Sequence, residues 1–232
     1  IGGRAVACLE LAAGRAANSA WLARRHAQSR FTALDLSEVQ LRYARRSAAR
    51  LANLAVRQGD YHDLSGIDDA STDIVFNIEG LCYSTDKARV FAEVFRVLKP
   101  GGSFLIYDGY SDRPAQKRAA DESRAALLLE RGMAITEFER YPEMIVSAQT
   151  VGFDLADQED LSAAIMPSAE RLERRATRLL DLGPLAHVVI RALPVSLIDN
   201  VVTAYLMPIL IRRRVFCYMA TVLRKPPRAG EA

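Results

Sequence analysis

One stretch near the start of the chain constrains the fold more than any other. An apolar run, Ala7–Leu11, carries the carboxylate of Glu10 near its end, and small residues around Gly14 lead into a helix-forming segment. A buried parallel strand is typically such an apolar run. Small residues after it let a ligand approach the backbone closely, and the next helix points free N–H groups into the same crevice. The stretch therefore predicts a strand, a turn suited to a ligand, and a helix.

A second carboxylate ends the next apolar run. Asp35 follows Glu10 by 25 residues and closes the run Arg30–Asp35. That spacing suits one βαβ unit with an acid placed to bind ribose hydroxyls. A purely structural role for these residues stays equally open, because many α/β proteins have a strand, small residues and a helix without a ligand there.

Composition limits the class of protein. The 232 residues are half apolar, which predicts a single domain with a sizeable core. A net charge of +3 argues against a dedicated nucleic-acid binder. Three widely spaced cysteines, Cys8, Cys82 and Cys217, indicate neither a disulfide framework nor a metal site, so we expect a reducing cytoplasm. The chain starts without Met almost directly on the first strand, so we also expect it to be an N-terminally truncated domain spanning residues 1–232.

Periodicity and turn residues predict the remaining elements. We expect strands at 5–11, 30–35, 54–60, 72–78, 103–108, 153–161 and 215–223, and helices at 18–26, 37–51, 86–98, 114–132 and 141–151. Ser37 and Gln40 form a capping-box pattern, and the helix after them should point Tyr43 and Ala44 inward. The alternation predicts an α/β fold with a parallel sheet covered on both faces and ligands at the carboxyl strand ends.

Two consecutive blocks carry a family resemblance. Residues Phe76–Asp86 are followed by Phe91–Gly102, a helix and turn before a strand. With these blocks in order, the chain resembles the class I S-adenosylmethionine-dependent methyltransferases, and most closely the branch with sterol and tocopherol C-methyltransferases and natural-product O-methyltransferases. The resemblance implies a Rossmann-like, doubly wound, seven-stranded sheet with an antiparallel last strand. In addition, the helix-like apolar segments of residues 165–214 predict a helical substrate cap inserted before that strand.

The resemblance implies S-adenosylmethionine as cofactor and assigns its contacts. Glu10 would lie near the methionine moiety, Gly14 would let the backbone approach it, and the backbone around Asn77 would contact its amino group. The other contacts would be Asp35 to the ribose hydroxyls, Leu36 beside the adenine, and Asp60 with Tyr61 at the adenine amino group.

The chain departs from the family pattern at two places. Ala12 and Ala16 stand where the family loop usually has glycine on either side of Gly14. Tyr83 stands where this branch often has a histidine. A tyrosine is a poorer base, but it can orient a hydroxyl or stabilise a developing cation through its ring. Glu79 is the first candidate for substrate contact or proton removal.

The resulting hypothesis is methyl transfer to a small, largely hydrophobic acceptor such as a lipid, terpenoid, quinone or polyketide. It depends on the apolar character of residues 165–214, which would line a cavity over the methyl group. Helix packing or a homodimer contact would explain that character equally well. Peripheral membrane contact beside Arg212–Arg214 is a third reading. A non-catalytic partner subunit and an NAD-dependent dehydrogenase remain alternatives. We expect His62 to lie in a solvent-facing loop and His187 to be structural.

Overall fold

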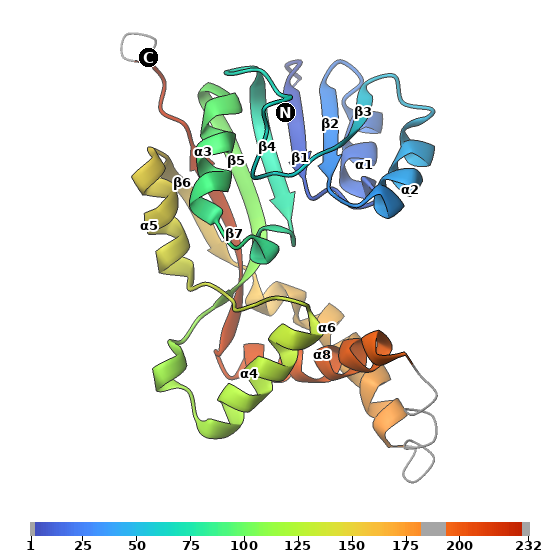
Figure 1. The fold of residues 1–232 in the computed structure, drawn as a ribbon, viewed down its shortest axis with the longest axis vertical. Coiled ribbons are helices and arrows are strands. Elements are labelled where there is room, and N and C mark those ends of the chain that lie inside the picture. Colours follow the sequence, from blue (N-terminus) through green and yellow to red (C-terminus); the bar gives the residue numbers. More distant parts are fainter. Residues whose placement is uncertain (1–2, 182–193, 229–232) are drawn as a thin grey trace. The chain divides into compact units, whose positions relative to one another are not determined.

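A computed structural model describes residues 3–181 and 194–228 (Figure 1). Within these residues, one sheet has the strand order β3-β2-β1-β4-β5-β7-β6. Its strands are β1 (Ala7–Leu11), β2 (Arg30–Asp35), β3 (Leu54–Gln58), β4 (Thr72–Ile78), β5 (Leu98–Ser111), β6 (Asp154–Asp160) and β7 (Phe216–Arg224). The α-helices are α1 (Ala17–Arg25), α2 (Glu38–Ala48), α3 (Lys87–Val97), α4 (Ala120–Gly132), α5 (Tyr141–Val151), α6 (Ser162–Leu180) and α8 (Val195–Arg212). Two short 3₁₀ helices are η1 (Leu81–Tyr83) and η2 (Ala115–Lys117).

Strand pairing confirms the predicted fold class. β1 lies between β2 and β4 and pairs in parallel with both, while β4 also pairs in parallel with β5. The last strand runs the other way. The amide of Gly101 donates to the carbonyl of Lys225, and the amide of Asp112 donates to the carbonyl of Val215, so residue numbers rise along β5 as they fall along β7. This is the doubly wound sheet with an antiparallel last strand.

The chain divides into two compact units. The first is built from residues 1–108, 143–159 and 220–232, and the second from residues 109–142 and 160–219. Strands β5 and β7 continue from one unit into the other along the chain. Helices α6 and α8 of the predicted insertion belong to the second unit together with α4. His187 lies outside the described residues, and the cap role of residues 165–214 stays a prediction.

Helices α1 and α2 pack on one face of the first unit's sheet through small residues. Ala20, Ala23 and Ala44 are buried against Phe31 and Leu54. Alanines let these helices lie close to the strands. Burying each large apolar side chain contributes about 1.5–3 kcal/mol. The burial of Phe31 and Leu54 therefore helps to hold both helices on the sheet.

Helix α3 is amphipathic, and its buried side contains Phe91 and Val94. The Phe91 ring meets Phe104 of β5 and Phe153 beside β6 edge to face, with centroids 6.3 and 6.4 Å apart. Asp86 caps the helix by accepting a hydrogen bond from the amide of Arg89. The ring contacts of Phe91 therefore hold α3 against β5 in an aromatic cluster separate from the core under α1 and α2.

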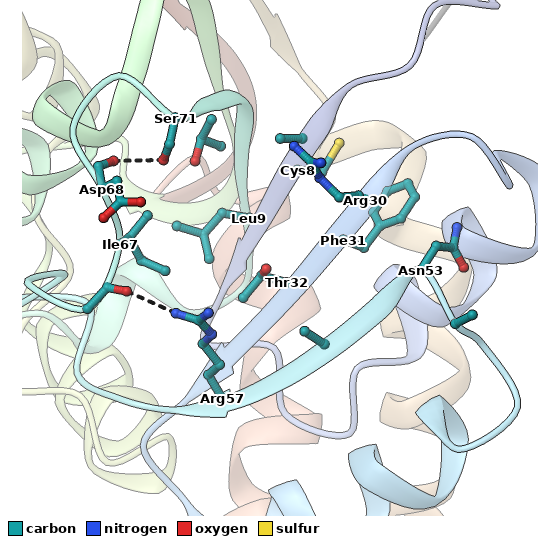
Figure 2. Close-up of a pocket in the computed structure, with 15 residues that line it drawn as sticks. Cys8, Leu9, Arg30, Phe31, Thr32, Asn53, Arg57, Ile67, Asp68 and Ser71 are labelled. Carbon is teal, nitrogen blue, oxygen red and sulfur yellow. Dashed lines mark hydrogen bonds between the residues drawn. The ribbon is translucent and has the colours of Figure 1, made fainter.

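The connection from β3 to β4 contains no helix in residues 59–71, all of which are described. Arginines hold it instead. Arg96 donates to the carbonyls of Ile67 and Leu64 at 3.0 and 2.8 Å, and Arg57 donates to the carbonyl of Gly66 at 2.9 Å. Figure 2 shows the cavity of about 350 Å³ that this segment covers over β1, β2 and β3.

Several details differ from the sequence predictions. Tyr43 of α2 is 43% exposed, not inward, because Leu41 and Ala44 occupy the buried side of that helix. β5 continues past Asp108 to Ser111, since its pairing with the last strand extends it. The helix expected from residue 114 begins only at Ala120, after the 3₁₀ helix η2.

In the second unit, α6 and α8 are joined by ion pairs. Arg212 on α8 lies 3.3 Å from Glu170 and 2.9 Å from Glu173 on α6. Helix α8 also approaches α4 closely, because a Cβ built on Gly132 would lie 2.2 Å from the hydroxyl of Thr203. Among the described helices, none is both long and apolar enough to cross a bilayer.

Candidate functional site

A cavity of about 370 Å³ lies in the first unit where β2 and β3 end. Ligands of open α/β sheets bind at the carboxyl ends of strands. The cavity brings together several of the predicted site residues and others that the sequence did not single out: Ala12, Leu34, Asp35, Leu36, Gly59, Asp60, Tyr61, His62, Gly80 and Tyr83. The cavity in Figure 2 lies instead under the β3–β4 connection and includes the first residues of β1 and β2. The cavity at the ends of β2 and β3 is therefore the candidate site, and we call it the β2–β3 cavity.

The loop between β1 and α1 has three left-handed residues. Ala12, Gly14 and Ala16 have φ angles of 51°, 54° and 55°. This conformation favours glycine, because a Cβ crowds the following carbonyl at a cost of roughly 1–2 kcal/mol per residue. The two alanines that replace family glycines therefore keep the glycine-like path of the loop. Left-handed non-glycine residues of this kind tend to cluster at ligand sites.

Asp35 ties this loop to the end of β2. Its Oδ2 accepts a hydrogen bond from the amide of Gly14 at 2.7 Å, and its Oδ1 accepts one from the amide of Ser37 at 2.8 Å. Each carboxylate oxygen has a second lone pair. Asp35 can therefore hold the loop and still accept hydrogen bonds from a ligand in the cavity.

Glu10 is not among the residues that line the cavity. It is 2% exposed, and its carboxylate accepts hydrogen bonds from the amide and hydroxyl of Ser19 and from the side-chain amide of Asn18. Burial raises the pKa of Glu10 above its ordinary value, although these hydrogen bonds and the start of α1 oppose that effect. Helix α1 begins at Ala17, so Asn18 and Ser19 lie in its first turn, from which both bind Glu10.

Asp60 is held by its neighbour His62. Oδ1 of Asp60 accepts from the backbone amide of His62 at 2.9 Å and lies 2.7 Å from its Nδ1. The other ring nitrogen, Nε2, lies 2.8 Å from the hydroxyl of buried Ser84. The backbone hydrogen bond is the main cause that lowers the pKa of Asp60. His62 therefore connects the end of β3 to the segment before α3. It lies in a loop as expected, but its side chain is partly buried and does not simply face solvent.

Asn77 of β4 is buried and is not among the residues that line the cavity, but it holds the backbone beside it. Its amide donates to the carbonyl of Leu11 at 2.8 Å, and its oxygen accepts from the amides of Gly80 and Leu81 at 3.2 and 2.8 Å. A Cβ on Gly80 would lie 2.6 Å from the Cβ of Ala12. The Asn77 side chain thus holds the backbone of Leu11, Gly80 and Leu81 and uses its polar atoms to do so. Only the main chain around Asn77 is then left to contact a ligand.

The two predicted catalytic residues lie close in sequence but differ in setting. Tyr83 lines the cavity and is half exposed, and partial burial raises the pKa of its phenol, so it stays protonated near neutral pH. Glu79 is exposed, has a φ of 55° at the kink after β4, and is not among the cavity-lining residues. Asp108 is buried, and its carboxylate accepts from the amide of Cys82 at 2.9 Å.

The donor and acceptor pattern of the cavity suits a nucleoside. Carboxylates at Asp35 and Asp60 accept from hydroxyl and amino groups, and Leu36, 69% exposed, offers an apolar surface for a base. Tyr61 closes one side by donating to the carbonyl of Gly80 at 3.3 Å. Sequence reasoning found both acids, but it missed His62, although His62 directly follows Asp60 and Tyr61 in the strand-end cluster.

The chain is similar to known methyltransferases. The methyltransferase domain family matches residues 9–106. A curated relative, 24-methylenesterol C-methyltransferase 2 of Arabidopsis thaliana, is 28% identical over 177 residues, which cover 72% of this chain and 46% of that protein. The chain therefore spans about half the length of that relative.

Solved structures share the fold. A putative sarcosine dimethylglycine methyltransferase from Galdieria sulphuraria has a TM-score of 0.75 at 19% identity, covering 96% of this chain and 79% of its own. Geranyl diphosphate C-methyltransferase from Streptomyces coelicolor A3(2) has a TM-score of 0.73 at 19% identity, covering 95% and 72%. Residues 9–106 therefore match a methyltransferase domain family, and the chain resembles the class I S-adenosylmethionine-dependent methyltransferases, among them the sterol C-methyltransferases.

Proposed function

We propose that this chain binds S-adenosylmethionine in the β2–β3 cavity and transfers its methyl group to a small, largely hydrophobic acceptor. The observation that carries the proposal is the joint presence of Asp35, Asp60 and Leu36 around one cavity beside a glycine-like loop. In this proposal Asp35 accepts from the ribose hydroxyls, Asp60 accepts from the adenine amino group, and Leu36 packs on the adenine. Gly14 and the backbone near Asn77 would contact the methionine end.

The cofactor, when bound, supplies a methyl group on a sulfonium, which an acceptor displaces in line as the carbon–sulfur bond breaks and its electron pair stays on sulfur. The protein's part is orientation and proton handling. Glu79 is proposed to take the proton that the acceptor loses. Tyr83 remains a phenol, so it is proposed to orient the acceptor or to stabilise positive charge with its ring.

The acceptor class rests on two supports. The relatives named above act on a methylenesterol and on geranyl diphosphate, both isoprenoid compounds. Helix α8 is largely apolar along its length. We therefore propose an isoprenoid-type acceptor and a cap role for residues 165–214, with sterols and prenyl chains as the first compounds to assay.

Binding of S-adenosylhomocysteine tests the cofactor site. We expect calorimetry to show binding, and Asp35→Asn to weaken it by roughly 10–100-fold, since a hydrogen bond to a charged group contributes about 1.5–3 kcal/mol. Asp63→Asn is the matched control, because Asp63 accepts from the amide of Ser65 in a nearby turn and does not line the cavity.

Two results would contradict the proposal. Thermal stabilisation by NAD but not by S-adenosylhomocysteine would favour a dehydrogenase. No binding of either compound would favour a non-catalytic subunit. If the cofactor binds, transfer of a labelled methyl group to a panel of sterols, prenyl alcohols and quinones then tests the acceptor class separately.

A further inference from the structure

Helix α2 has apolar side chains on its outward side. Val39 and Tyr43, one helical turn apart, are 56% and 43% exposed. Leu41 and Ala44 occupy the opposite, buried side. A surface helix normally places charged and polar residues opposite its core face. Two large apolar residues there are an exception that the fold of the first unit does not explain.

Arginines surround these two residues. The guanidinium of Arg15 lies 4.5 Å from the centre of the Tyr43 ring, and that of Arg46 lies 5.7 Å from it. Arg42 and Arg50 are exposed on the same helix or directly after it. We call the set of Val39, Tyr43, Arg42, Arg46 and Arg50 the outer face of α2.

Positive charge is concentrated in this part of the chain. Residues 15–50 contain eight arginines, all exposed, against two acids, Asp35 and Glu38. The segment therefore carries +6 while the whole chain carries +3. Glu38 pairs with Arg45 and also lies one helical turn from Arg42, so it offsets only part of this charge. The outer face is thus a positive surface with apolar side chains at its centre.

The arginines near the end of α8, where the sequence suggested membrane contact, are placed differently. Arg212 pairs with Glu170 and Glu173, and Arg213 pairs with Asp121. Arg214 pairs with two aspartates at 2.7 and 2.6 Å. These charges are balanced by neighbouring acids, so they attract an anionic surface less than the outer face of α2 does.

We propose that the outer face of α2 docks on an anionic lipid surface. Arginines would meet lipid phosphates, and Val39 and Tyr43 would enter the headgroup region, the arrangement typical of helices that lie in a membrane interface. A nucleic acid would use the arginines but would not need exposed aliphatic residues between them. The inference is independent of methyl transfer, and it would place the protein where hydrophobic compounds concentrate.

Vesicle co-sedimentation tests the proposal. The wild-type chain should bind phosphatidylcholine vesicles containing phosphatidylglycerol, and binding should fall as salt rises and be far weaker on pure phosphatidylcholine. The triple variant Arg42→Gln, Arg46→Gln and Arg50→Gln should bind at least about tenfold more weakly, since each basic residue near an anionic surface contributes roughly fivefold. The double variant Val39→Ser and Tyr43→Ser should weaken binding at low and high salt alike.

A second triple variant is the control for charge alone. Arg171→Gln, Arg174→Gln and Arg175→Gln remove the same charge from exposed positions on α6 and should leave vesicle binding near the wild-type level. Equal loss in both triple variants would overturn the proposal, as would the absence of wild-type binding to anionic vesicles. Circular dichroism of each variant establishes that it is folded. Binding to an acidic protein without vesicle binding would assign the face to a protein partner and also overturn the proposal.

Discussion

The backbone amide of Gly14 donates a hydrogen bond to Oδ2 of Asp35, with 2.7 Å between nitrogen and oxygen. This contact joins the loop after β1 to the end of β2, so the left-handed loop and the acid are positioned together. A change in the loop's conformation should therefore affect the acid, which makes the backbone of residues 12–16 the first subject for mutation.

Substitutions at Gly14 and Ala12 should have opposite effects on stability. Gly14→Ala places a Cβ on a residue with φ 54° but with no atom within 4 Å, so it adds strain without a clash. We expect a loss of about 1 kcal/mol in the free energy of unfolding. Ala12→Gly removes such strain and should raise the free energy of unfolding by up to about 1 kcal/mol. Part of this gain is lost because glycine has more conformational freedom in the unfolded chain. Urea denaturation measures both, and destabilisation by Ala12→Gly would show that its left-handed backbone is not strained.

The contact between Gly80 and Ala12 can be tested by a double-mutant cycle. Gly80→Ala would bring its Cβ to 2.6 Å from the Cβ of Ala12, and we expect a loss of about 1–3 kcal/mol from overpacking. Combining it with Ala12→Gly should recover part of that loss, because one of the two clashing methyl groups is gone. The amide of Asn77 still lies 2.7 Å from the new Cβ, so recovery should be incomplete. Strict additivity of the two changes would refute the contact.

The pH dependence of stability should report the burial of Glu10. Its pKa is raised in the folded protein, so the folded state binds this proton more tightly than the unfolded chain does. The resulting stabilisation is complete below the ordinary value of 4.5 and is lost as the pH rises through the raised value. Glu10→Gln cannot ionise. The stability of the wild type relative to this variant should therefore decline from pH 4 to pH 7.

Substitution of His62 should change cofactor affinity more than the rate of methyl transfer, if the proposed cofactor site is right. His62→Leu removes both the ring contact to Asp60 and the contact to Ser84. We expect S-adenosylhomocysteine to bind about fivefold to tenfold more weakly, in line with the loss of one hydrogen bond of about 1–1.5 kcal/mol. His62→Asn keeps a donor near the position of Nδ1 and should restore most of the affinity. Ser84→Ala tests the contact of His62 with Ser84 alone. If His62→Leu bound S-adenosylhomocysteine as tightly as the wild type, His62 would have no role in positioning Asp60.

Several elements follow from sequence pattern alone. β2, β4 and α5 begin and end at the predicted residues. Buried apolar runs bounded by turn residues define the two strands, and Gly152 ends the helix with a left-handed backbone. Asp35 and Asp60 could be placed because strand-end acids at this spacing share one edge of a parallel sheet.

Other features depend on contacts that a linear pattern does not contain. The helical spacing of apolar residues in α2 allows Tyr43 to face either the core or solvent. Only the packing of Leu41 and Ala44 against the sheet decides which side of the helix is buried. Glu10 was expected at the cofactor, yet it binds Ser19 and Asn18 because the turn after β1 brings the start of α1 over it. The role of Glu10 toward a methionine moiety stays a prediction.

The arginines that hold the β3–β4 connection have a consequence for how this protein responds to its surroundings. The guanidinium groups of Arg96 and Arg57 bind main-chain carbonyls there, and such groups keep their charge at any pH a cell experiences. Mild alkali should therefore leave this covering in place, whereas strong acid should weaken it by protonating Glu93, which pairs with Arg96 and accepts from the amide of Leu64. Guanidinium ions in solution present the same chemistry to the same oxygens, so this part of the molecule should loosen early in that denaturant and become a first point of attack for proteases.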